Sequence, residues 1–107
     1  MDTIKVIYKM LERLEKAMDE ERFDWHEIDH EAFGISELKW TRIILLMQER
    51  GLIDGFSLVH MMGQTYPGIK PIDPRITFEG LEYLAENSNT AKIINVAKLL
   101  KDTIPGL

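Results

Sequence analysis

The middle of the chain carries both a helix start and a helix stop, and the residues beyond the stop change in character. Ser36 can cap a first turn because its hydroxyl accepts from free backbone amides, and Glu37 suits the positive end of a helix. An amphipathic run over Leu38–Arg50 then reaches Gly51, and glycine most easily adopts the left-handed conformation beyond a helix end. We therefore expect a long helix that stops at Gly51.

The residues after this helix favour a hairpin. Leu52–Ile53 and Phe56–Met62 are rich in strand-forming residues, and glycines and prolines gather between residues 63 and 74. Arg75–Thr77 then has the character of a returning strand. This pattern predicts a two-stranded wing over about residues 53–76. Met62 and its neighbours are expected in the core, with an adaptable contact surface as the alternative.

Three further elements are expected before the long helix. A first helix has an apolar stripe formed by Ile4, Ile7, Leu11, Leu14 and Met18, with Asp2 or Thr3 as its cap. Phe23 and Trp25 alternate with polar residues, which predicts a very short third strand. A short second helix is expected over about residues 27–33, before Gly34. Trp40, in the long helix, is expected to be a core anchor rather than a base-stacking platform.

Two helices are expected after the hairpin. Thr77 can cap a helix over about residues 78–87, with inward side chains at Phe78, Leu81, Leu84 and Ala85. Gly80 in its first turn weakens a helix by about 1 kcal/mol relative to alanine, which indicates close backbone packing. A last helix over about residues 90–104 is apolar on more than one face. This property favours a homodimer through residues 90–104, the alternative being that the helix caps the core.

The order of these elements predicts the fold class. It is α+β, a winged helix-turn-helix with a three-helix core, a two- or three-stranded wing sheet and an additional C-terminal helix. At 107 residues the chain forms a single domain over residues 1–107. In such proteins the second helix of the helix-turn-helix lies in the DNA major groove with its N-terminal residues toward the bases.

Two motifs carry a family resemblance. Thr77–Leu84 has the pattern T-x-x-G-x-x-Y-L, and the residues from Glu49 to Ile53 read E-R-G-L-I just before the hairpin. On these motifs the chain resembles, over nearly its whole length, the YjcQ-like family of small winged-helix proteins from Gram-positive bacteria and their phages. The resemblance implies the same fold, and it suggests a phage association.

Charge and composition narrow the function. The absence of cysteine excludes disulfide scaffolds and thiolate zinc sites. The net charge of −5 is uneven, since residues 1–32 hold ten acids and five bases, whereas residues 33–76 hold four acids and five bases. The second region therefore approaches a polyanion without initial repulsion. No apolar run suits a signal peptide or a membrane span, so we expect a soluble cytoplasmic protein.

The basic residues of the central region supply candidate DNA contacts. These contacts are Ser36, Lys39 and Arg42 on the predicted recognition helix and Lys70 and Arg75 on the wing, with Gln64, Thr65 and Tyr66 at its tip. The free amides at Ser36 can hold a phosphate. Because these basic residues are few, they can neutralise only a few phosphates. This predicts weak and salt-sensitive binding to double-stranded DNA.

The sharpest local motif is His26-Glu27-Ile28-Asp29-His30, which matches H-E-x-x-H. On one helix this spacing places two imidazoles side by side for zinc. The segment is short and no third ligand follows at the usual spacing, so we expect a surface helix, with His26 and His30 only weak metal candidates.

We expect no enzymatic activity and no cofactor. The leading hypothesis is a DNA-binding protein in a regulatory or prophage-accessory role. The alternative is a protein-interaction or phage structural module, with the acidic segment over residues 19–31 as its docking face.

Overall fold

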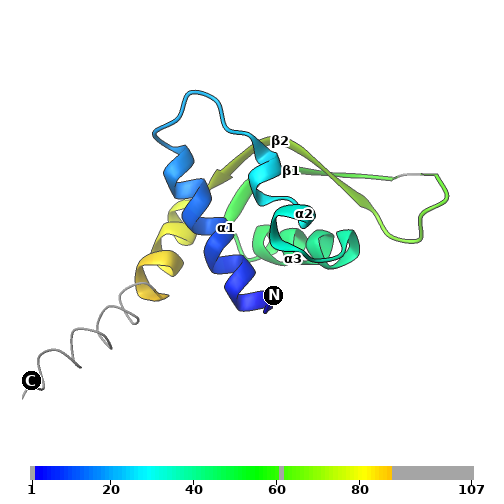
Figure 1. Cartoon of the computed structure of the whole chain (residues 1–107), viewed down its shortest axis with the longest axis horizontal. Coiled ribbons are helices and arrows are strands. Elements are labelled where there is room, and N and C mark those ends of the chain that lie inside the picture. Colours follow the sequence, from blue (N-terminus) through cyan, green and yellow to red (C-terminus); the bar gives the residue numbers. More distant parts are fainter. Residues whose placement is uncertain (1, 61, 88–107) are drawn as a thin grey trace, which may run out of the picture.

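The computed structural model describes residues 2–60 and 62–87 (Figure 1). The elements in chain order are α1 (Thr3–Ala17), the 3₁₀ helix η1 (Trp25–Ile28), α2 (His30–Phe33), α3 (Glu37–Glu49), β1 (Ile53–Val59) and β2 (Gly68–Ile76), followed by helical residues 78–87. The fold is α+β, and this arrangement is compatible with the winged helix that the sequence predicts. The helix predicted over residues 90–104, and with it the predicted homodimer contact, lies outside the described residues.

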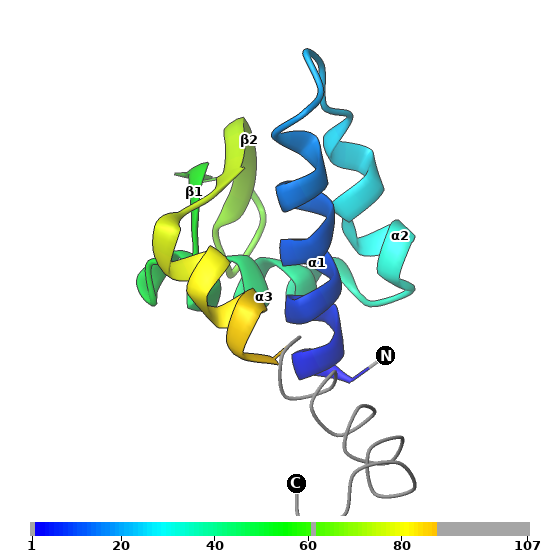
Figure 2. The same ribbon diagram turned by 90° about the vertical axis from the view of Figure 1, so that its left-hand side faces the viewer.

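The first helix, α1, runs through the centre of the molecule, with the hairpin on one side and α2 on the other (Figure 2). Its buried face consists of Val6, Ile7, Met10, Leu11 and Leu14. Ile4 and Met18, which the sequence places in the apolar stripe, are exposed, so that prediction is wrong at both ends of the helix. Asp2 precedes the helix in extended conformation, and its side chain makes no capping hydrogen bond.

The predicted third strand is wrong. The segment around Phe23 joins α1 to η1, and the sheet in the described part of the chain has two strands. The carboxylate of Asp24 accepts a hydrogen bond from the backbone N–H of His26 at 3.1 Å and thereby caps η1. This local hydrogen bond competes successfully with the strand conformation that the alternating aromatic residues favour.

The boundaries of the next two helices follow from capping. The carboxylate of Asp29 accepts from the backbone N–H of Ala32 at 2.8 Å and starts α2. The hydroxyl of Ser36 accepts from the backbone N–H of Lys39 at 3.0 Å and starts α3. Gly51 has a φ of 71°, the left-handed conformation expected beyond a helix end. The predicted start and stop signals of α3 are therefore confirmed.

The hairpin is confirmed, but its second strand is longer than predicted. It begins at Gly68 rather than near Arg75 and continues through two prolines. Pro71 lies opposite Phe56, whose backbone N–H and C=O bond to the side chain of Gln48. The two residues therefore form a pair without ladder hydrogen bonds, so the missing N–H of proline costs nothing there.

The other proline lies where the strand register shifts. Asp54 pairs with Arg75 and Phe56 with Pro71, so three residues of β2 lie opposite Gly55. Gly55 has a φ of 92°, and a Cβ added to it would lie 1.7 Å from a backbone oxygen of β2. This bulge needs glycine, and it also accommodates the second proline of the strand.

The chain after the hairpin packs closely against the end of α3. Thr77 Oγ1 accepts from the backbone N–H of Gly80 at 3.0 Å and donates to the carbonyl of Gly51. A Cβ at Gly80 would lie 2.1 Å from the carbonyl oxygen of Leu52. The predicted Thr77 cap and the close backbone packing at Gly80 are thus confirmed.

This backbone contact also sets which side of the helix over residues 78–87 faces inward. Leu84 is buried and Leu81 is partly buried, as predicted. Phe78 is 71% exposed, and Ala85 is exposed as well, so both predictions of inward side chains are wrong. With Gly80 turned toward Leu52, the helix cannot also direct Phe78 into the core.

The core lies between α1, α3 and the base of the hairpin. Trp40 is 4% exposed, and its Nε1–H donates to the carbonyl of Ile28 at 2.7 Å, which confirms it as a core anchor. Trp25 is half-buried beside it, with 6.2 Å between the two ring centroids. Met62, expected in the core, is fully exposed at the hairpin tip. In the described part of the chain, no helix combines the length and apolarity of a membrane span.

Candidate nucleic-acid interface

The candidate recognition helix presents a mixed surface. In Figure 1 the hairpin passes beside α3 and extends well beyond the helical part of the molecule. Arg42 is exposed on α3, six residues after the N-terminal Ser36, and Lys39 between them is half-buried. The remaining exposed side chains of this helix and its end are Glu37, Leu46, Glu49 and Arg50. The basic character of α3 is therefore confined to a few positions.

The wing adds a second exposed cation at Lys70. It lies on β2 opposite Ser57 of β1, and both side chains are exposed. At the tip, Gln64 and Thr65 are exposed and Tyr66 is half-buried. Arg42 and Lys70 thus present positive charge on two different elements. Within residues 2–60 and 62–87, neither side chain lies in ion-pair distance of a carboxylate.

Arg75 is different, because the hairpin supplies its partners. Its Nη2 donates to Asp54 Oδ2 at 3.2 Å, and its Nη1 lies 3.9 Å from Asp73 Oδ2. The pKa of Asp54 is lowered, first by a hydrogen bond from the backbone N–H of Gly55 and then by the Arg75 side chain. The positive charge of Arg75 is therefore offset by two neighbouring acids.

The surroundings of Arg75 are acidic as well. A groove of about 310 Å³ separates β2 from the loop after α1, and Glu20, Glu21, Asp73 and Arg75 are among its lining residues. This end of the hairpin repels a phosphate backbone more than the region around Lys70 does. Among the predicted wing contacts, the geometry therefore favours Lys70 over Arg75.

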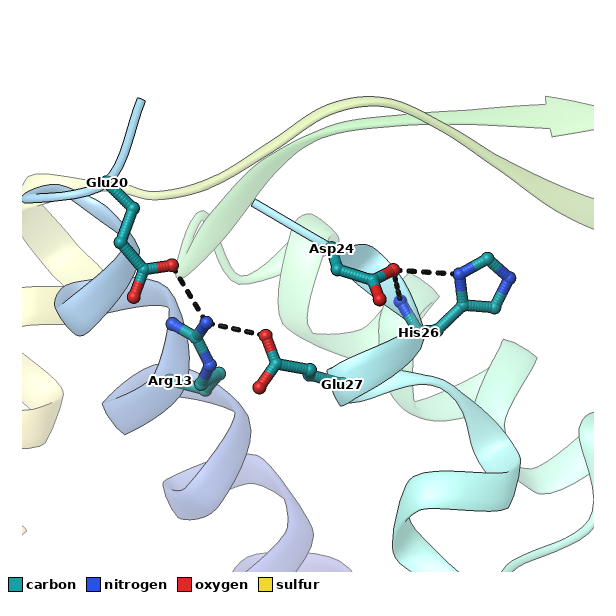
Figure 3. Close-up of polar contacts among 5 residues, drawn as sticks. All are labelled: Arg13, Glu20, Asp24, His26 and Glu27. Carbon is teal, nitrogen blue, oxygen red and sulfur yellow. Dashed lines mark hydrogen bonds and ion pairs between the residues drawn. The ribbon is translucent and has the colours of Figure 1, made fainter. Parts of the chain in front are cut away.

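The acidic segment is held to α1 by Arg13, which the sequence did not single out. Figure 3 shows its Nη2 between two carboxylates, donating to Glu20 Oε1 at 2.8 Å and to Glu27 Oε2 at 2.6 Å. The guanidinium also lies 4.9 Å from the ring centroid of Phe23. The hydrogen bond from Arg13 lowers the pKa of Glu20, and the bonds to Glu27 and then Glu20 raise the pKa of Arg13.

The two histidines of the H-E-x-x-H motif lie on different elements. His26 belongs to η1 and His30 begins α2, and Asp29 between them has extended backbone. The His26 Nδ1 lies 2.8 Å from Asp24 Oδ1 (Figure 3), and its hydrogen bonds lower the pKa of Asp24. The shared helix face that a zinc site requires is absent here. Nor do the described residues contain any group of three or more His, Cys, Asp or Glu placed to hold a metal ion.

A second residue that the sequence did not single out joins α3 to the wing. Gln48 Nε2 donates to the carbonyl of Phe56 at 3.1 Å, and Gln48 Oε1 accepts from the Phe56 N–H at 3.2 Å. These two bonds hold the centre of β1 against α3. A glutamine on the polar side of a helix carries no sequence signal for such a role, because its partner lies eight residues away on another element.

A known protein family matches most of the chain. The sequence model of the family described as "YjcQ protein" matches residues 8–103. No curated protein and no solved structure matches the chain.

Proposed function

The chain belongs to the YjcQ family, and on this premise we propose that it is a small winged-helix protein that binds duplex DNA in a regulatory or prophage-accessory role. The observation that carries the proposal is the pair of exposed cations, Arg42 on α3 and Lys70 on β2. Helix-turn-helix proteins apply the second helix of this motif to the major groove and use neighbouring segments on the phosphate backbone.

In this proposal the N-terminal half of α3 enters the groove. Ser36 and the free amides of the first turn face a phosphate, while Arg42 and the half-buried Lys39 reach toward the bases or the backbone. Lys70 contacts the backbone alongside. Because so few cations take part and the whole chain carries a charge of −5, the affinity is low, and it falls with salt in proportion to the small number of phosphate contacts.

The decisive experiment is a fluorescence-anisotropy titration with mixed-sequence duplex DNA at about 50 mM and about 200 mM salt. The native chain should bind at the lower salt and bind more weakly at the higher salt. The double variant Arg42→Gln/Lys70→Gln should bind more weakly, with the slope of log affinity against log salt reduced by about 1 for each lost phosphate contact.

A matched control removes the same charge elsewhere. Lys5→Gln/Lys9→Gln changes two exposed lysines on α1 and should leave most of the affinity intact. The proposal fails if the native chain shows no binding at about 50 mM salt, where electrostatic affinity is strongest. The assigned surface is wrong if the control variant weakens binding as much as the Arg42/Lys70 variant does.

A second candidate function is protein interaction, and a specific observation favours it. The hairpin exposes three large apolar side chains, Leu58, Met62 and Ile72, which are available to the apolar surface of a protein partner. The acidic segment is a weaker docking face, because several of its carboxylates already bond within the chain. Co-purification from the host tests this function. A protein partner that co-purifies with the native chain but not with the Leu58→Ser/Met62→Ser variant, while this variant still binds DNA, would support protein interaction.

A further inference from the structure

An apolar groove lies where α1, the end of α3 and the helical residues 78–87 meet. It has a volume of about 450 Å³, which is within the range of small-molecule sites. Most of its lining residues are aliphatic, namely Ile4, Ile7, Leu46, Met47 and Leu52. Figure 2 shows the N-terminal part of α1 beside residues 78–87, which contribute Tyr83 to the groove. The groove therefore has the size and the apolar lining of a site for a small ligand.

The aliphatic walls of this groove are open to solvent. Ile4 is 57% exposed and Leu46 is 44% exposed, although α1 and α3 each have a well-buried inner face. Single apolar side chains on a surface are ordinary, but apolar side chains that share one concavity mark a binding site. The walls of the groove are thus accessible to an apolar ligand.

Arg50 determines the chemistry of that ligand. Among the described residues that line the groove, it alone carries a charge. Its side chain is exposed, and no carboxylate within residues 2–60 and 62–87 lies in ion-pair distance of it. Arg13 and Arg75, in contrast, are offset by neighbouring acids. A guanidinium without an acidic neighbour, next to an apolar surface, is complementary to a carboxylate on an apolar chain, because it can bind both carboxylate oxygens at once.

We propose that the groove binds an amphipathic anion, a carboxylate on a medium-length aliphatic chain. The carboxylate contacts Arg50, and the aliphatic chain lies along Ile4, Leu46 and Leu52. A cation of the same shape is disfavoured, because it would meet Arg50 with a like charge. The inference does not depend on DNA binding, since Arg50 lies at the opposite end of α3 from Ser36, where the proposed DNA contact begins.

The test is a titration of the full-length, ¹⁵N-labelled chain with octanoate and, separately, with octylammonium. The two ligands have the same chain length and opposite charges. Octanoate should shift the amide signals of Ile4, Leu46 and Leu52 and leave that of Gln64, on the hairpin tip, unchanged. The whole chain carries a charge of −5, so unspecific attraction favours octylammonium. A preference for octanoate therefore reports the local charge at the groove.

A pair of variants tests the charged end of the site. Arg50→Gln should weaken octanoate binding by about fivefold, as expected for an ion pair at an exposed rim, and should not weaken octylammonium binding. Lys16→Gln removes the same charge near the far end of α1 and should leave octanoate binding nearly unchanged. Equal losses in the two variants would overturn the role of Arg50 and with it the anionic class of the ligand.

A second pair tests the apolar walls. Leu46→Ser removes part of the lining and should weaken octanoate binding, whereas Leu58→Ser, at a similarly exposed leucine of the hairpin, should not. Each methylene added to the ligand should tighten binding by up to about fourfold until the groove is full. Binding that does not depend on chain length or on Leu46 would overturn the assignment of the groove.

The native chain gives the simplest outcomes. Unchanged signals of Ile4 and Leu46 at millimolar octanoate would overturn the proposal. If these signals shift instead when the protein is diluted without ligand, the groove belongs to a contact with a second copy of the chain. Equal affinity for octanoate and octylammonium would also overturn the proposal, because the groove would then bind apolar chains of either charge.

Discussion

The acidic segment over residues 19–31 and the surface formed by α3 and the wing both stand out in the sequence by their charge, yet the fold uses them differently. In the acidic segment, Glu20 and Glu27 bond to Arg13, and Asp24 bonds to His26. On the other surface, Arg42 and Lys70 face solvent. A dense run of like charges can therefore be structural, while isolated cations such as Arg42 and Lys70 stay exposed to solvent.

The hairpin itself contains the same contrast between a paired charge and an exposed one. Arg75 and Lys70 are five residues apart on the same strand and carry the same charge. The register places Arg75 opposite Asp54, whereas it places Lys70 opposite Ser57. What distinguishes the two residues is the side chain that the sheet brings opposite each of them, and this difference can be tested by substitution.

The largest expected effect is the loss of stability in Arg13→Met. The change removes the hydrogen bonds to Glu20 and Glu27 and leaves these two carboxylates close together without the guanidinium that bridges them. We expect the free energy of unfolding to fall by about 1–3 kcal/mol, measured by urea denaturation. The control Lys16→Met, exposed on the same helix, should change it by less than about 0.5 kcal/mol. Equal losses would show that the Arg13 contacts are not structural.

The second effect concerns the cap of α2. Asp29 is 7% exposed and accepts from the backbone N–H of Ala32, so Asp29→Ala should lower the free energy of unfolding by about 1 kcal/mol. Glu31→Ala removes an exposed acid from the same segment and should lie within about 0.5 kcal/mol of the native chain. If Glu31→Ala is as harmful as Asp29→Ala, the total charge of the segment matters more than its hydrogen bonds.

A smaller effect is the pH dependence of stability. The pKa of Glu20 is lowered from its ordinary value of 4.5 by the hydrogen bond from Arg13, and that of Asp24 from 3.8 by those from His26. A carboxylate whose pKa is lower in the folded state stabilises the fold above its ordinary pKa, and that contribution is lost as the pH falls through the folded pKa. Urea midpoints should therefore decline below about pH 4.5, and less steeply in Arg13→Met. A parallel decline in both proteins would contradict the assigned cause.

The smallest expected effect is that of Arg75→Gln on DNA affinity. Because Asp54 and Asp73 already offset the charge of Arg75, anisotropy titrations should give nearly the native affinity. Lys70→Gln, the same kind of change on the same strand, should weaken binding and reduce its salt dependence. An equal loss in the two variants would show that pairing within the hairpin does not remove Arg75 from the interface.

The parts of the fold that the sequence predicts are those that depend on local chemistry. Ser36 and Gly51 bound α3 as expected, because capping and left-handed backbone involve residues close together in the chain. The hairpin also lies where strand-forming and turn-forming residues predict it. Gly80 is predictable for a different reason, since an unfavourable residue in a helix needs a compensating contact.

The parts that the sequence does not predict depend on partners far along the chain. The orientation of Phe78 follows from the contact of Gly80 with Leu52, and the path of β2 through Pro71 depends on the opposite strand. The candidate site divides in the same way. Exposed cations on α3 and the wing are foreseeable from their positions, whereas the pairing of Arg75 depends on the register of the sheet.

The two hydrogen bonds between Gln48 and Phe56 limit the motion of the hairpin relative to α3. Hinge motion between the hairpin and α3 at this point breaks both bonds together, at a cost of about 2 kcal/mol. Helix α3 and the hairpin therefore keep a nearly fixed distance from each other. The proposed DNA complex therefore requires a duplex whose groove and backbone lie at the matching separation.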